Sequence, residues 1–197
     1  MLSLSLLKKH FKWAALLVIG FTVGVVGYSL STHYTQDDHQ WNTKEFPAFV
    51  AFDSTLSDKE DLIVRDINRW NDLCGEPLLS LGPTLTSSTY VYGSVTYDVA
   101  ILLINEIENR DPDVVAVTSR AIKANSTEID YAYIDMLRTT PDTHIEATIL
   151  HELGHALGLV HTTDPKSVMY IETNPTKLNF TEQDKQQLLD KYGQYCH

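Results

Sequence analysis

Three histidines, one glutamate and two glycines lie close together in HELGHALGLVH, residues 151–161. His151 and His155 are four residues apart, so on a helix their rings lie one turn apart and can face a common point. Two imidazoles at that spacing suit a zinc ion. Glu152 lies about 100° further round such a helix, where it can meet a metal-bound water instead of completing the ligand set. The pattern therefore predicts two metal ligands and one general base.

A catalytic zinc site needs a third protein ligand and an open coordination position. A helix that continued beyond His155 would carry the chain away from the metal. Gly158 can adopt a left-handed conformation and end the helix, which allows His161 to return to the ion. The five fixed positions of H-E-x-x-H-x-x-G-x-x-H would occur by chance in a chain of this length on the order of once in 10⁵. We therefore predict a zinc site formed by His151, His155 and His161.

This stretch resembles the zinc-binding consensus of the metzincin metalloproteases. Ser167–Tyr170 (SVMY) resembles the Met-turn that follows that consensus, and the spacing of eight residues from His161 to Met169 is similar to that of the matrixin branch. The end of an early helix (RWN), the stretch YAYIDM and a final TEQD…KYG helix are similar to matrixin elements in the same order. The resemblance covers about residues 44–193.

The resemblance implies an α+β fold of the metzincin zincin type. Such a domain has a twisted mixed sheet of about five strands with an antiparallel edge strand, three helices, and a small C-terminal subdomain after Gly158. One catalytic Zn²⁺ would be held by the three histidines, and Met169 would form a hydrophobic floor under it. The implied activity is hydrolysis of peptide bonds in extracytoplasmic proteins or peptides, by a zinc-bound water that Glu152 activates. An extended substrate is expected along an edge strand near residues 128–136.

Hydrophobic periodicity predicts the elements that position this site. Residues 46–52 alternate as a strand, and an apolar stripe predicts a helix from about Asp58 to Leu73, with a capping box at residues 57–60. Residues 74–84 contain two glycines and two prolines and are expected to break the pattern. Three β-rich stretches come next, at residues 91–104, 113–122 and 128–137.

Two further helices are expected in the last third of the chain. The first begins with Thr140 as its N-cap and Pro141 at the first helical position, and it ends at Gly158. The second begins at Thr181, which is followed by acidic residues, and stops at Gly193.

The N-terminal residues differ from the rest of the chain. Three lysines precede Trp13–Leu30, a stretch of eighteen uncharged residues that is long enough to cross a bilayer as a helix. The lysines would keep the N-terminus in the cytoplasm, so the rest of the chain is expected outside it. The protein would then be a single-pass membrane protein, or be secreted after signal cleavage. The predicted regions are a cytoplasmic basic segment (1–12), a transmembrane anchor or signal peptide (13–30), a linker (31–43) and a zinc metallopeptidase domain (44–197).

Net charge and cysteine content limit the classes of binding partner and the cellular compartment that we expect for this protein. The net charge is −11, with +3 before Ser31, and so acidic a domain is a poor candidate for binding nucleic acid.

Cys74 and Cys196 are the only two cysteines and form a candidate disulfide in an oxidising compartment, with two free thiols as the alternative. The scattered acidic residues give no basis for predicting a Ca²⁺ site, and a monomer is assumed.

Two alternatives to a matrixin-like peptidase remain open. One is a zinc-stabilised binding module without catalysis, and the other is a zinc hydrolase with an acidic third ligand such as Glu172. Thr162 and Ile171 stand where matrixins usually have serine and proline, so no side-chain preference of the substrate is predicted. Residues 74–77 are similar to the cysteine switch of matrixin propeptides. They follow the first helix of the domain and lack the preceding arginine, so no inhibitory propeptide is expected.

Overall fold

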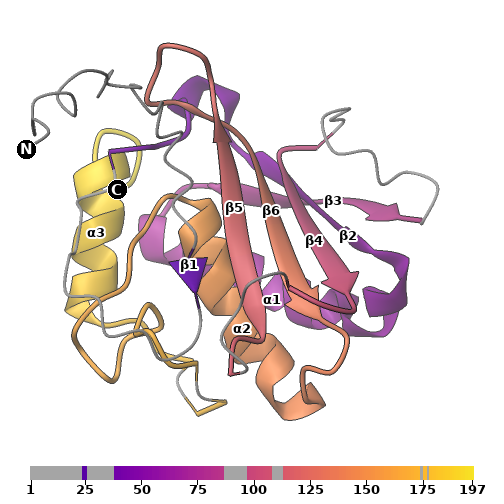
Figure 1. Ribbon diagram of the computed structural model, residues 1–197. Helices are drawn as coiled ribbons and strands as arrows, with labels where there is room; N and C mark the ends of the chain where they lie inside the picture. Colours follow the sequence, from indigo (N-terminus) through magenta and orange to yellow (C-terminus); the bar gives the residue numbers. More distant parts are fainter. Residues whose placement is uncertain (1–23, 26–37, 87–96, 108–112, 174, 177) are drawn as a thin grey trace, which may run out of the picture.

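The computed structural model of the chain describes residues 24–25, 38–86, 97–107, 113–173, 175–176 and 178–197 (Figure 1). The described elements, in chain order, are β1 (Gly24–Val25), η1 (Thr43–Glu45), β2 (Ala48–Asp53), η2 (Ser54–Lys59), α1 (Glu60–Cys74), β3 (Leu79–Leu85), β4 (Val99–Ile104), β5 (Ala116–Ile122), β6 (Ile129–Leu137), α2 (Asp142–Ala156) and α3 (Glu182–Tyr192).

The described strands form one mixed sheet in the order β1-β5-β6-β4-β2-β3. β2 pairs in parallel with both β3 and β4, and β4 pairs in parallel with β6. β5 is antiparallel to β6, and the two-residue strand β1 is antiparallel to β5. The crossover from β2 to the parallel strand β3 runs through α1, as parallel neighbours require. The predicted α+β fold with a mixed sheet and three helices is confirmed.

Two helices cover one face of the sheet, while α3 lies to one side (Figure 1). Trp70 of α1 is fully buried in the core between sheet and helices, and its indole nitrogen donates to the Leu150 carbonyl of α2 at 2.9 Å. The ring of Phe180, just before α3, lies 4.5 Å from the Trp70 ring. The opposite face of the sheet carries a smaller apolar cluster that includes Leu102 and Tyr133. Trp70 thus joins α1, α2 and the approach to α3, which together support the candidate site.

The position of the edge strand was predicted wrongly. Residues 128–136 were expected at an edge, but they fall almost entirely in β6, which lies between β5 and β4: Ala132 pairs with Arg120 on one side and Val99 on the other. The alternation of apolar and polar side chains indicates which face of a strand is buried, but it does not indicate the position of that strand in the sheet. β5 is instead the antiparallel strand on the outer side of the sheet, with only β1 beyond it.

A strand was also missed at residues 79–85, where glycine and proline predicted a break. β3 is the last strand of the sheet, and a terminal strand tolerates Pro83 because one row of its backbone groups has no neighbour. Asn71 of α1 holds the start of this strand: its side-chain oxygen accepts from the backbone of Leu78 and Leu79 at 2.8 and 3.0 Å. Gly82 suits the crowded backbone, because a Cβ there would lie 3.0 Å from the Val50 carbonyl carbon.

The helix starts differ in detail from those predicted. The expected capping box at residues 57–60 is not formed, because a 3₁₀ helix precedes α1 and the Ser57 hydroxyl donates to the Ser54 carbonyl. In α2, Pro141 is the N-cap instead of the first helical residue. In α3, Thr181 is the N-cap and forms a capping box with Asp184. The starts of α1 and α2 therefore lie one or two residues later than predicted.

Most of the predicted membrane-crossing stretch, Trp13–Leu30, lies outside the described residues. Its two described residues, Gly24 and Val25, form β1, so at these positions the backbone pairs with β5 instead of forming the predicted helix. Among the residues that the structure describes, no helix has the length and hydropathy needed to span a bilayer. Trp41, assigned to the linker from the sequence, is buried, and its indole nitrogen donates to the Ala156 carbonyl at 2.8 Å.

A disulfide joins Cys74 at the end of α1 to Cys196 after α3. Both residues are buried, and the described part of the chain contains no free cysteine. We expect reduction to lower the free energy of unfolding by roughly 5 kcal/mol, because the bond closes a loop with a sequence separation of 122. Urea unfolding with and without reductant measures this, and the Cys74→Ala/Cys196→Ala variant should be insensitive to reductant. Two titratable thiols in the untreated protein would contradict the bond.

Asp66 of α1 is fully buried, and neither carboxylate oxygen has a hydrogen-bond partner among the described residues. Burial, with a smaller contribution from Glu146, raises the pKa of Asp66 from 3.8 to about 8. The unfolded chain releases this proton near pH 4 and the folded chain only near pH 8, so the residue costs increasing stability as the pH rises through that interval.

We therefore expect Asp66→Asn to stabilise the chain by roughly 1–3 kcal/mol at pH 7.5 and by little at pH 4.5. Thermal unfolding across this pH range measures the difference. Asp61→Asn, at an exposed position of the same helix, is the matched control and should leave the pH profile unchanged. An equal effect of Asp66→Asn at both pH values would mean that the buried charge is not the cause.

Candidate metal centre

Helix α2 presents His151 and His155 from its C-terminal half, and both rings are buried. The Nδ1 atom of His151 lies 2.7 Å from the Val168 carbonyl oxygen, and that of His155 lies 2.9 Å from the Leu159 carbonyl oxygen. A carbonyl oxygen only accepts, so each ring must carry its proton on Nδ1. In the neutral rings Nε2 then carries a lone pair, which is the form of histidine that binds a metal.

A sharp turn at Gly158 brings the third histidine back. Gly158 has φ +88°, and its N–H donates to the His155 carbonyl at 2.9 Å. The N–H of Leu159 donates to the Gly154 carbonyl at 3.0 Å. These two bonds form a Schellman motif, which ends α2 and redirects the chain towards His161. The turn is also crowded, because a Cβ on Gly158 would lie 2.6 Å from the His39 carbonyl oxygen.

The three rings converge on one point through their Nε2 atoms. The Nε2 of His155 lies 3.1 Å from the Nε2 of His151 and 3.1 Å from that of His161. With its Nδ1 protonated, the neutral His155 ring has no proton to offer His151, so two lone pairs face each other. A tetrahedral zinc ion with nitrogen ligands at 2.0–2.1 Å would separate them by about 3.3 Å. The three nitrogens therefore fit Zn²⁺ in number, chemistry and spacing.

The protonation of the rings also suits metal binding. Burial, together with the neighbouring His151 and His161, holds the pKa of His155 well below its usual value. Burial lowers the pKa of His161 to about 4. Both rings are thus neutral at pH 7, which is the form that coordinates a metal.

Glu152 follows His151 on α2 and is fully buried. Its Oε2 accepts a hydrogen bond from the Thr118 hydroxyl of β5 at 2.5 Å, whereas Oε1 has no hydrogen-bond partner among the described residues. Burial raises the pKa of Glu152 to about 8, and the bond from Thr118 opposes this rise. A divalent cation held by the histidines would also oppose the rise and lower the pKa of Glu152. One carboxylate oxygen is therefore fixed and the other is available to exchange a proton.

Met169 lies buried beneath α2. A Cβ on Gly154 would collide with the Met169 sulfur and with the Trp70 ring, so only glycine allows this close approach. The Thr162 N–H donates to the Met169 carbonyl at 2.8 Å, and Thr162 and Tyr170 form an isolated parallel bridge. The loop that follows His161 thereby closes on itself under the three histidines.

Asp184 ties this loop to α3. The Ser167 hydroxyl donates to Oδ1 of Asp184, and the Met169 N–H donates to the Ser167 hydroxyl oxygen at 2.8 Å. Oδ2 of Asp184 accepts from the Thr181 N–H at 2.7 Å, which completes the N-terminal cap of α3. A single buried carboxylate thus fixes both the Met169 loop and the start of the last helix.

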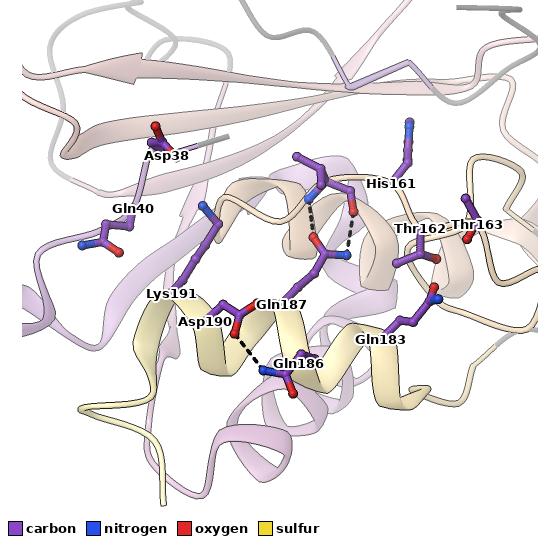
Figure 2. Close-up of a pocket in the computed structure, with 11 residues that line it drawn as sticks. Asp38, Gln40, His161, Thr162, Thr163, Gln183, Gln186, Gln187, Asp190 and Lys191 are labelled. Atoms are coloured by element: carbon purple, nitrogen blue, oxygen red, sulfur yellow. Dashed lines mark hydrogen bonds between the residues drawn. The ribbon is translucent and has the colours of Figure 1, made fainter. Parts of the chain in front are cut away.

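A cavity of about 540 Å³ adjoins His161 on the α3 side. Figure 2 shows His161 at its rim, with side chains of α3 along its floor. Gln187 holds one wall in place, because its side-chain amide accepts from the Val160 N–H at 2.9 Å and donates to the Val160 carbonyl at 3.0 Å (Figure 2). The residues that line this cavity are Asp38, Gln40, Val160, His161, Thr162, Thr163, Gln183, Gln186, Gln187, Asp190 and Lys191.

The structure brings most of the sequence-predicted site residues together: His151, Glu152, His155, Gly158, His161 and Met169. Within the part of the chain that the structure describes, the group suited to a metal consists of the three histidines alone, and Glu172 is exposed outside it. Thr118, Gly154 and Asp184 were not predicted from the sequence as residues of the site. The sequence around Asp184 signals a helix cap, but Thr118 lies on a distant strand and no spacing rule connects it to Glu152.

Residues 26–193 match the matrixin family. The chain is similar to probable matrix metalloproteinase 095L of Invertebrate iridescent virus 3, with 44% identity over 45 residues, 23% of this chain and 12% of that protein. It is also similar to matrix metalloproteinase-A of Caenorhabditis elegans, with 43% identity over 47 residues, 24% of this chain and 9% of that protein. The aligned stretches span about a tenth of these relatives. Because the family match covers most of the chain, the chain belongs to the matrixin family.

We expect Gly158→Ala to weaken zinc binding at least tenfold and to lower the melting temperature. The left-handed conformation is strained for alanine, and its Cβ would meet the His39 carbonyl, so the turn that delivers His161 would be displaced. Competition with a chromophoric chelator measures the zinc affinity. Thr163→Ala, two residues beyond His161 and exposed, is the control. Unchanged zinc affinity in Gly158→Ala would show that the turn does not position His161.

Proposed function

We propose that this chain is a zinc-dependent endopeptidase in which His151, His155 and His161 hold the metal and Glu152 is the general base. The observation that carries the proposal is the state of Glu152, a fully buried carboxylate beside the three histidines with one oxygen unpaired among the described residues. A site that served only to stabilise the fold would gain nothing from burying an incompletely paired carboxylate, which costs free energy.

A bound zinc ion supplies a Lewis acid, which polarises a carbonyl group and lowers the pKa of a coordinated water. The chain's own residues handle the proton. Oε1 of Glu152 accepts it from the attacking water and later donates it to the leaving amine, while Oε2 stays bound to Thr118. The apolar surroundings of α2 exclude bulk water from this exchange, so the proton remains between the carboxylate and the reacting groups.

The proposed substrate is an extended peptide that pairs with the outer edge of β5. Support comes from β1, since Gly24 pairs with Thr118 and Val25 with Val117, so this edge accepts an antiparallel strand. A substrate would take the place of these two residues. Thr118 also contacts Glu152, so a peptide paired at this point would lie next to the base. Pairing through the backbone gives affinity with little dependence on side chains.

A zinc-stabilised binding module without catalysis is the second candidate function. It shares the three histidines and the edge of β5, and it differs only in giving Glu152 no role in chemistry. The acidic third ligand considered from the sequence has less support, because exposed Glu172 is outside the histidine group and His161 fills the third position. Peptide cleavage that depends on both zinc and Glu152 separates the two functions.

We further propose that the domain acts outside the cytoplasm. The Cys74–Cys196 bond supports this, because disulfides persist mainly in oxidising compartments. The apolar stretch at residues 13–30 would provide export, either as an anchor or as a cleaved signal. Membrane insertion of this stretch and the pairing of β1 with β5 exclude each other. Alkaline washing of isolated membranes separates these states: an anchored chain stays in the membrane pellet, and a chain released into the supernatant would contradict the anchor.

We expect Glu152→Gln to retain one zinc per chain and to lose 10²-fold or more of the peptide-cleaving activity, because glutamine is similar in shape but takes up no proton. Metal analysis and cleavage of a peptide library measure the two properties. Asp142→Asn, an exposed carboxylate on the same helix, is the control and should behave as the parent chain. Parent chain that carries zinc but cuts no peptide would favour the binding module, whereas undiminished turnover in Glu152→Gln would remove this residue from the mechanism.

A further inference from the structure

We propose that Thr118 is a positioning residue that holds the Glu152 carboxylate in its working orientation. The inference rests on the proposed peptidase function and extends it to a residue on a different element. Thr118 is in the middle of β5, whereas Glu152 is on α2. The two residues are 34 positions apart and meet only because the sheet packs against the helix.

The position of Thr118 is fixed by the sheet. Its side chain is buried, with 1% of its surface exposed. β5 pairs with β6 along its whole length, and Thr118 lies opposite Ile134 in that ladder. A β-branched side chain has few accessible rotamers, so a rigid backbone also fixes the hydroxyl group. Thr118 is therefore a stationary donor, in contrast to the long and rotatable side chain of Glu152.

The hydrogen bond between them has a defined direction. An ionised carboxylate only accepts, so the Thr118 hydroxyl donates to Oε2 of Glu152. The hydroxyl oxygen lies 2.5 Å from Oε2, and the alternative acceptor, the Glu152 carbonyl oxygen, is further away at 3.2 Å. The bond occupies Oε2 and leaves Oε1 as the oxygen that exchanges protons.

The same contact is compatible with both states of the base. When Oε1 carries a proton, Oε2 is the carbonyl oxygen of a neutral acid and still accepts from Thr118. The orientation of the carboxyl group is then preserved between proton uptake and proton release. Because the backbone of Thr118 lies on the edge proposed to pair with the peptide, one residue would set the distance between the substrate and the base. A small error in such a distance lowers the rate of the chemical step more than it weakens substrate binding.

A purely structural role for Thr118 predicts different behaviour. In that case the side chain fills space between sheet and helix, and valine, which has the same shape, would replace it without loss. The hydroxyl group distinguishes the two roles. Thr118→Val removes the donor and keeps the volume, whereas Thr118→Ser keeps the donor and removes a methyl group.

The test uses the full chain loaded with zinc, and it compares kcat and KM for one cleaved peptide in four proteins. These are the parent chain, Thr118→Val, Thr118→Ser and the control Thr84→Val. Thr84 is exposed on β3, the strand at the opposite end of the sheet from β5. Zinc content and melting temperature are measured for each protein, so that a loss of folding or of metal is recognised.

We expect Thr118→Val to lower kcat about tenfold or more with KM within about twofold of the parent value, because the lost bond orients the base and does not touch the peptide. Thr118→Ser should recover most of the rate, and Thr84→Val should match the parent chain. Equal kcat in Thr118→Val and the parent, or equal losses in the valine and serine variants, would overturn the inference and leave the peptidase function intact. A parent chain without cleavage activity would overturn the proposed function instead.

A binding measurement provides a readout besides activity. Acetohydroxamic acid binds metals through its two oxygens and releases a proton, which Oε1 of Glu152 is placed to accept. Calorimetric titration of the zinc-loaded proteins should show several-fold weaker binding to Thr118→Val and near-parent binding to Thr118→Ser. Equal affinity for all variants would count against a fixed orientation of Glu152.

Discussion

Metal binding by His151 and His155 depends on two backbone carbonyl groups that accept hydrogen bonds from their rings. The carbonyls of Val168 and Leu159 each accept from an Nδ1 atom, and this fixes the protonated nitrogen of His151 and His155. Neither carbonyl belongs to α2. Leu159 follows the turn at Gly158, and Val168 precedes Met169 in the loop held by Asp184. The ligand geometry of the helix therefore depends on the chain beyond its end being correctly folded.

The end of α2 is also fixed by residues near both ends of the described chain. The indole nitrogen of Trp41 donates to the Ala156 carbonyl at 2.8 Å, and the Tyr192 hydroxyl donates to the Leu157 carbonyl at 2.7 Å. These bonds satisfy carbonyl groups that a helix end leaves unpaired. Lys191 donates to the His39 carbonyl, which is the group that crowds Gly158. Residues from three distant parts of the chain thus meet at the point where α2 gives way to the third ligand.

The sequence was sufficient to predict that the three histidines come together, because their spacing is local. The positions depend on one helix and the turn that ends it, which hold His151, His155, Gly158 and His161. Both elements can be predicted from the spacing of residues within a single stretch of sequence. The order of strands was not predictable in the same way, since the alternation in β6 fits a central strand as well as an edge strand. β3 was missed because its support comes from Asn71 on α1, a contact that no composition rule contains. Thr118 was missed for the same reason: its partner is 34 residues away.

The disulfide between Cys74 and Cys196 encloses the strands β3 to β6 and the helices α2 and α3 within one covalent ring. The histidines, Glu152, Thr118 and Met169 all belong to that ring. A single cut in any surface loop inside it would leave both fragments attached to each other through the sulfur atoms. A peptidase that works among other peptidases, or among copies of itself, would then keep its metal-binding residues together after being nicked.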